Sequence, residues 1–157
     1  MDITFTFDSA YGRYVHAAVE SVLDHHRSED LTFWFLVTAD VTGEMRDRLK
    51  WQVGDRAQVH ILDPDVALDD LPVSSVEEFQ YVSRAAYLRL LLPRLLPEHV
   101  DRLLYLDCDI LCAGSLRELF DLDLRGNVLA AVRDAHVETL SDMDGMPGLE
   151  QYPDLDP

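Results

Sequence analysis

Short apolar segments alternate along this chain with longer segments in which apolar residues recur at helical spacing. Ile3, Phe5 and Phe7 alternate with polar residues, as in a strand that buries one face. Between Val15 and Val22, apolar residues lie three and four positions apart, as on one face of a helix. The two patterns predict strands over residues 2–7, 32–38, 59–62, 102–106 and 128–132, and helices over residues 13–26, 42–51 and 83–92.

Local signals define the ends of several of these elements. Thr42 is a favourable N-cap for the second helix, and Pro93 is expected to end the third. Ser75 and Glu78 have the spacing of a capping box, which predicts a further short turn of helix. The histidines of the first helix, His26 among them, are expected to lie at its surface.

Strands that alternate with helices predict an α/β fold with a Rossmann-like, mostly parallel and doubly wound sheet. Apolar periodicity is lost from residue 134 onward. We therefore expect one folded domain over residues 1–134, followed by an irregular tail over residues 135–157.

Composition narrows the function classes. The chain has 157 residues, of which 48% are hydrophobic and 27% charged, as in one globular domain with its own core. A net charge of -17 argues against binding to nucleic acid or to an anionic membrane surface. No apolar run has the length of a transmembrane segment, and the amino terminus lacks the pattern of a secretory signal. Cys108 and Cys112 lie in one short segment and are expected to be reduced, which favours a cytoplasmic location.

The strand predicted at 102–106 runs directly into two carboxylates, Asp107 and Asp109. Ligands of open α/β sheets bind at the carboxyl ends of strands, and residues two apart on a strand point the same way. We expect the two carboxylates to converge while Cys108 points elsewhere. Their repulsion would be relieved by a hard divalent cation. Asp-x-Asp recurs elsewhere in this aspartate-rich chain, but only this pair follows a clean apolar strand, and a solvated turn is the alternative.

Several motifs together resemble glycosyltransferase family 8. They are the loop from Asp8 to Tyr11 after the first strand, the Tyr-x-Arg sequence ending at Arg89, and Leu-Tyr-Leu-Asp-x-Asp followed by Ser-Leu-x-x-Leu-Phe-Asp. The resemblance runs from Asp2 to about Asp134, and its most specific part is residues 103–123. It implies a GT-A nucleotide-sugar-binding fold, a UDP-sugar donor, a saccharide or lipid-linked saccharide acceptor, and retention of anomeric configuration.

The resemblance also implies roles for individual residues. Asp107 and Asp109 match the family's metal-binding pair, which would hold Mn²⁺ (or Mg²⁺) against the diphosphate. The implied nucleotide-sugar contacts come from Asp8 at the uracil edge, Ala10 beside the nucleotide, Tyr11 stacked on the base, Arg89 near the diphosphate, Cys108 through its backbone to the ribose, and Asp134 facing the transferred sugar. The catalytic residues stay unassigned.

Each of these residues also has a structural interpretation. Asp8 could end its strand and cap the following helix, and Tyr11 could pack on that helix as an ordinary loop aromatic. Arg89 lies among apolar residues and needs an anionic partner, which a structural aspartate would supply as well as a phosphate. Ala10 stands where relatives often have a polar residue, which would remove one contact to the nucleotide.

The family's later motifs, Asn-Ser/Ala-Gly and His-x-x-Gly-x-x-Lys-Pro-Trp, are not found, and no lysine follows Lys50. We therefore expect a chain cut short after its nucleotide-binding half, acting as the donor-binding part of a retaining, metal-dependent glycosyltransferase. Apolar surface at 128–132 would then favour self-association. A non-catalytic nucleotide-binding or interaction module is the main alternative. A haloacid-dehalogenase-like phosphatase fits less well, because it needs an early Asp-x-Asp and a later lysine.

Overall fold

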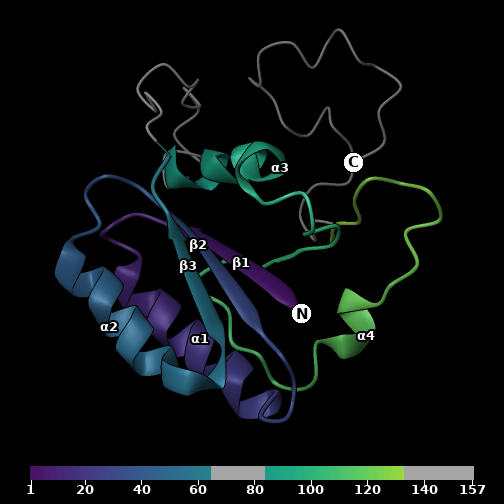
Figure 1. The fold of residues 1–157 in the computed structure, drawn as a ribbon, viewed down its shortest axis with the longest axis horizontal. Helices are drawn as coiled ribbons and strands as arrows, with labels where there is room; N and C mark the ends of the chain where they lie inside the picture. The colour runs from purple at the N-terminus through teal and green to yellow at the C-terminus, as the bar shows by residue number, and fades with distance from the viewer. Residues whose placement is uncertain (65–83, 133–157) are drawn as a thin grey trace, which may run out of the picture. The chain divides into compact units, whose positions relative to one another are not determined.

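The structure is a computed structural model that describes residues 1–64 and 84–132. Four strands form one sheet in the order β3-β2-β1-β4, and every strand pair is parallel (Figure 1). The strands are β1 (Asp2–Phe7), β2 (Thr32–Val37), β3 (Gln58–Leu62) and β4 (Leu104–Tyr105). The prediction of an α/β fold with a mostly parallel sheet is confirmed.

Helices cover both faces of this sheet, as the doubly wound prediction requires. On one face lie α1 (Gly12–His25) and α2 (Gly43–Val53), which continues into the short 3-10 helix η1 (Gly54–Arg56) (Figure 1). On the other face lie the 3-10 helix η4 (Arg84–Leu91) and α3 (Leu92–Leu95). The Thr42 hydroxyl accepts a hydrogen bond from Met45 N at 3.3 Å, which confirms the predicted N-cap. A fourth helix, α4, spans Arg117–Phe120.

Alternation along the strands separates two apolar clusters. Phe5 and Phe35 are fully buried, and their rings stack with centroids 5.9 Å apart in the cluster that α1 covers. Leu36, the next residue along β2, instead packs with Leu88 and Leu92 in the cluster beneath η4 and α3. Because neighbouring residues on a strand face opposite ways, a fully apolar strand such as β2 is buried on both faces.

Two predicted elements, the helix over residues 83–92 and the strand over residues 102–106, take a different form in the structure. The helix predicted over residues 83–92 is a 3-10 helix over Arg84–Leu91, and Pro93 lies in the first turn of α3 rather than after a helix end. Proline is tolerated there because the first helical N–H groups have no intrahelical partner. The strand predicted over residues 102–106 is limited to Leu104–Tyr105, so Asp107 and Asp109 lie in a turn beyond it.

Two further predictions are wrong. Residues 128–132 form no strand, and the side chains of Val128 and Val132 are 95% and 92% exposed. The chain turns just before these residues, where Arg125 and Gly126 both have positive φ. Among the described residues, no strand pairs with this apolar segment. His26 is buried rather than at the surface, because it lies beyond the last turn of α1 and faces the segment before α4.

The chain divides into two units. The first contains every strand and helix named above, and the second contributes residues 123–132 to the part described here. The predicted turn at Ser75 and Glu78, the candidate residue Asp134 and the tail over 135–157 lie outside the described residues. Within residues 1–64 and 84–132, no helix has the length and apolar character needed to cross a membrane.

Candidate functional site

Acidic residues follow all four strands at the carboxyl edge of the sheet. Asp8 follows β1, Asp40 lies in the loop after β2, Asp63 follows β3, and Asp107 and Asp109 follow β4. Carboxyl ends of parallel strands meet at one edge, which is the usual ligand-binding edge of open α/β sheets. β1 and β4 are neighbouring strands in which Ile3 is paired with Leu104. The turns that follow the two strands are therefore also neighbours.

Tyr105 orients the first carboxylate of the predicted metal pair. Its hydroxyl donates a hydrogen bond to Asp107 Oδ1 at 2.9 Å and lies 3.1 Å from Thr6 Oγ1. An ionised carboxylate can only accept, so the single Tyr105 proton goes to Asp107 and the Thr6 hydroxyl donates to Tyr105. Burial is the main cause that raises the pKa of Tyr105 to about 12, so the phenol stays a donor at physiological pH.

Arg89 lies against the same pair of residues. Its Nη2 atom is 3.5 Å from Asp107 Oδ1, and its guanidinium carbon is 4.3 Å from the centroid of the Tyr105 ring. Asp107 is therefore the anionic partner that the sequence required for this arginine. The two side chains are 42% and 57% exposed, so their ion pair contributes little stability and both groups can be reached from solvent.

Cys108 faces inward between the two exposed aspartates. Its buried thiol donates to the Thr6 carbonyl oxygen at 3.3 Å. Burial raises the pKa of Cys108 to about 12, with further contributions from the charges of Asp107, Asp109 and Asp8. The thiol is therefore protonated and inert.

The loop after β1 is shaped by two carboxylates. Asp8 Oδ1 accepts hydrogen bonds from Ala10 N at 3.0 Å and Tyr11 N at 3.1 Å, so Asp8 shapes the loop before α1, whose N-cap residue is Tyr11 and which no side chain caps. Asp40 Oδ2 accepts from both the backbone N–H and the hydroxyl of Ser9. These Ser9 bonds, followed by that of Thr38, lower the pKa of Asp40. The loop is thus tied to the end of β2.

Tyr11 and Ala10 differ in their surroundings. The Tyr11 side chain is half-buried against the main core cluster, and its ring centroid lies 5.6 Å from that of Tyr14. Ala10 is exposed. The Tyr11 ring is therefore partly held by packing, in a loop whose neighbouring residue Ala10 is exposed.

Sequence reasoning missed Tyr105, Thr6 and Asp40. The position of Asp40 just after a strand, at the same edge as Asp8, was an available signal. Nothing local marks Thr6, because its partner Tyr105 is 99 positions away in the chain.

A cation at this edge would have few protein ligands. Within residues 1–64 and 84–132, no group of three or more His, Cys, Asp or Glu side chains is arranged to hold a metal ion. Asp107 and Asp109 are exposed oxygen donors, which suit Mg²⁺ or Mn²⁺ when substrate oxygens or water complete the coordination. The donor set therefore fits a cation shared with a ligand.

Comparison with known proteins places this chain. Residues 2–148 match the sequence model of the family described as Glycosyl transferase family 8. The chain belongs to glycosyl transferase family 8. Lipopolysaccharide 1,2-glucosyltransferase of Escherichia coli (strain K12) is 31% identical over 134 residues, which cover 85% of this family 8 chain and 38% of that protein. Glycosyltransferase GlyB of Streptococcus pneumoniae serotype 4 is 31% identical over 141 residues, covering 85% of this chain and 31% of GlyB.

Solved structures agree with the family assignment. Galactosyltransferase LgtC, in complex with donor and acceptor sugar analogs, superposes with a TM-score of 0.69 at 29% identity, over 79% of this chain and 43% of LgtC. The apo form of GlyE from Streptococcus pneumoniae TIGR4 gives a TM-score of 0.62 at 25% identity, over 85% of this chain and 29% of GlyE. The family 8 chain has the GT-A fold and spans less than half the length of these relatives.

Proposed function

We propose that this family 8 chain binds the nucleotide-sugar donor of a retaining, metal-dependent glycosyltransferase. The donor is a UDP-hexose, and the acceptor is a saccharide or a lipid-linked saccharide. One observation supports this most strongly. Asp8 follows β1 and Asp107 and Asp109 follow the adjacent strand β4 at the same edge of the sheet, and the Arg89 Nη2 atom lies 3.5 Å from Asp107 Oδ1. Such a mixture of acidic groups and one accessible arginine suits a diphosphate bound together with a cation.

Asp107 and Asp109 would hold Mn²⁺ or Mg²⁺ in this proposal. Such a cation offsets the negative charge that develops on a departing nucleoside diphosphate. Tyr105 keeps Asp107 oriented, because its proton is donated to Oδ1 and the phenol does not ionise near neutral pH. Arg89 is half-exposed and would exchange its contact with Asp107 for a phosphate oxygen of the donor.

The loop after β1 would bind the nucleoside. Asp8 is held by its hydrogen bonds to the backbone of Ala10 and Tyr11, and Asp40 fastens Ser9 within the same loop. A carboxylate at this position can accept a hydrogen bond from a pyrimidine N–H, and the Tyr11 ring offers a face for stacking. Two relatives, a lipopolysaccharide 1,2-glucosyltransferase and the galactosyltransferase LgtC, support a hexosyl donor.

Calorimetry with UDP, in Mn²⁺ and then in excess EDTA, tests the proposal. We expect binding that depends on Mn²⁺ and that is weakened by Asp109→Asn. Asp123→Asn is the matched control, because Asp123 ends the Asp121-x-Asp123 pair and bonds only its own turn at Arg125 N in the described contacts. Equal UDP affinity with and without the metal would contradict the proposal. Transfer of labelled hexose from the UDP-sugar would then separate an enzyme from a nucleotide-binding module.

A further inference from the structure

The segment that follows the two aspartates contains no helix or strand before α4. Its backbone is nevertheless held at two points by side chains at the end of α1. Cys112 N donates to Ser21 Oγ at 2.9 Å, and Leu116 N donates to His26 Nε2 at 3.0 Å. These are side-chain acceptors for backbone N–H groups that no secondary structure satisfies.

The Ser21 hydroxyl has a defined orientation. It donates its proton to the Ala18 carbonyl oxygen at 2.7 Å, one turn earlier in α1. Its lone pairs are therefore left to accept from Cys112 N. Because Cys112 is also buried, water does not readily replace this contact.

His26 has a defined tautomer for the same kind of reason. Its Nε2 atom accepts from Leu116 N, so the ring proton lies on Nδ1 and is donated to Glu29 Oε1 at 2.8 Å. The ring is buried, and the second Glu29 oxygen lies 3.7 Å from Arg117 Nη1. The hydrogen bond from Nδ1 to Glu29 thus holds the His26 ring in the orientation in which Nε2 accepts from Leu116 N.

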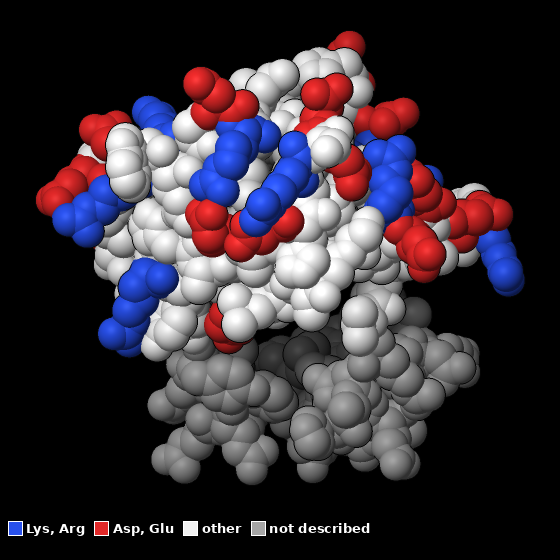
Figure 2. Space-filling view, turned by 90° about the horizontal axis from the view of Figure 1, so that it is seen from below, with Lys and Arg blue, Asp and Glu red and all other residues white. Residues whose placement is uncertain are grey.

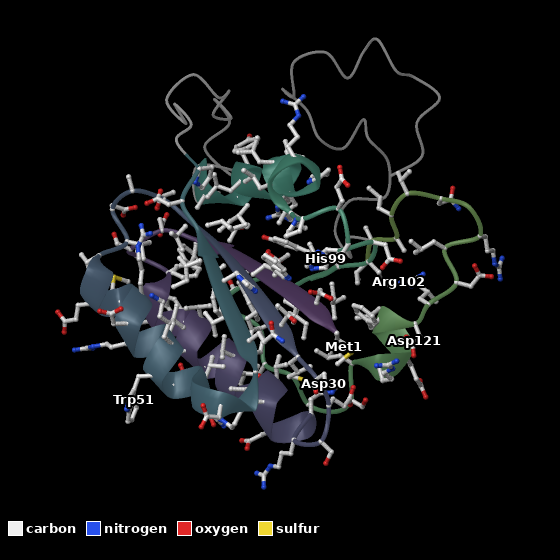
Figure 3. The ribbon with its side chains drawn as sticks, in the orientation of Figure 1. Met1, Asp30, Trp51, His99, Arg102 and Asp121 are labelled. Atoms are coloured by element: carbon white, nitrogen blue, oxygen red, sulfur yellow. The ribbon has the colours of Figure 1, made fainter. Side chains whose placement is uncertain are left out.

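Anchors recur every four residues along this segment. Cys108 is tied to Thr6, Cys112 to Ser21 and Leu116 to His26. Asp107 and Asp109 flank the first anchor, and only two residues separate Asp109 from the second. The end of α4 is held by Arg102, which donates hydrogen bonds to the carbonyl oxygens of Phe120 and Leu122 at 2.7 Å each. Figure 3 shows Arg102 beside that helix. The segment that follows the two carboxylates is therefore anchored at Cys112, at Leu116 and at the end of α4.

We propose that Ser21 and His26 are positioning residues for the Asp107/Asp109 pair. By holding the amides of Cys112 and Leu116 they fix the path of the chain away from Asp109, and so the position of its carboxylate. Small displacements of ligating oxygens weaken cation binding, because coordination distances are narrowly defined. This inference rests on the proposed function of the same site, and it assigns part of that function to the end of α1.

The test compares Ser21→Ala with Ser21→Thr, and His26→Leu with His26→Gln. The first member of each pair removes the acceptor, and the second retains one. We expect Ser21→Ala to weaken Mn²⁺-dependent UDP binding roughly five- to tenfold, the scale of one buried hydrogen bond, and Ser21→Thr to restore most of it. His26→Leu should weaken it at least as much, with partial rescue by His26→Gln. Ser115→Ala is the control, because Ser115 Oγ accepts only within its own exposed turn, from Arg117 N at 3.2 Å.

Thermal midpoints are measured alongside, so that folding and positioning are separated. If Ser21→Ala and His26→Leu lower the midpoint but bind Mn²⁺ with UDP as the wild type does, both residues are merely structural and the inference is overturned. If His26→Leu does not fold, the Ser21 pair decides alone. Failure of the proposed function has a different signature, because the wild type itself would then bind UDP equally well in EDTA.

Discussion

Tyr105→Phe is the most informative single substitution at this edge of the sheet. It removes one hydroxyl and keeps the ring, so the contact of the Arg89 guanidinium with the ring face is preserved. Two hydrogen bonds are lost, one donated to Asp107 Oδ1 at 2.9 Å and one accepted from Thr6 Oγ1 at 3.1 Å. The perturbation therefore isolates the orientation of Asp107 from the packing of β4.

The expected magnitude follows from the exposure of the two partners. A hydrogen bond to a charged acceptor contributes about 1.5–3 kcal/mol, and water replaces part of it where the acceptor is accessible. Since the Asp107 side chain is 57% exposed, we expect a loss of about 1 kcal/mol, or roughly fivefold in the affinity for UDP with Mn²⁺. The Thr6 hydroxyl loses its acceptor in a buried position, so the free energy of unfolding should also fall by about 1 kcal/mol.

Calorimetry with UDP in Mn²⁺ and urea denaturation measure these two effects separately. Tyr14→Phe is the matched control, because within residues 1–64 and 84–132 the Tyr14 hydroxyl accepts one hydrogen bond, from the neighbouring Arg13 Nη2 at 2.9 Å, and the residue is 42% exposed. It should leave UDP binding unchanged. If Tyr105→Phe binds UDP with Mn²⁺ as tightly as the wild type and is as stable, the Tyr105 hydroxyl does not orient Asp107 and the reasoning is refuted.

Two further predictions concern the base-binding loop and the helical face. Tyr11→Ala should weaken UDP and UDP-glucose equally, by on the order of 1 kcal/mol of stacking, and calorimetry showing unequal losses would place Tyr11 at the sugar instead. The Arg56 hydrogen bond, followed by that of Gln52, lowers the pKa of Glu20 to about 2, so the stabilisation is present above pH 4–5 and lost as pH falls toward 2. Glu20→Gln should therefore be less stable than the wild type at pH 7, by less than about 1 kcal/mol for a pair this exposed, and urea denaturation should show the gap closing by pH 2. A constant gap would contradict this assignment.

Local patterns predicted the strands and helices that bury one face against a continuous core. The boundaries of β1 agree with the predicted residues, and α1 starts and ends one residue earlier than expected. Prediction failed where an element depends on a partner distant in sequence. Apolar residues at 128–132 meet no strand partner among the described residues, and the extended segment around Leu104 pairs over only two residues. The periodicity of apolar residues indicates which face of a segment can be buried. It does not indicate which other segment of the chain packs against that face.

The charged face of the helices shows the same limit. Basic and acidic side chains are interspersed on the face drawn in Figure 2, so a net charge of -17 does not translate into one uniformly acidic surface there. The ion pair of Arg56 with Glu20 at 2.7 Å joins η1 to α1, and that of Arg48 with Glu44 at 2.8 Å joins successive turns of α2. Trp51 projects from α2 into solvent and is 85% exposed (Figure 3). The expected repulsion from polyanions rests on net charge alone, whereas the arrangement of charge is a property of the fold.

For the candidate site, the sequence predicted some of the charged residues but not the groups that hold them in position. Asp8, Asp107 and Asp109 were found because each follows an apolar strand. The Tyr105 hydroxyl, which orients Asp107, was not found, because its position depends on Thr6, 99 residues away in the chain. Arg89 illustrates the consequence. It lies 3.5 Å from Asp107 Oδ1, so a cation that bound this oxygen would compete with the contact, and the released guanidinium would favour an anion beside the cation. The diphosphate of a nucleotide is such an anion. Metal and nucleotide would then strengthen each other's binding by the same factor, as linkage requires, and the link would run through one arginine that both ligands affect.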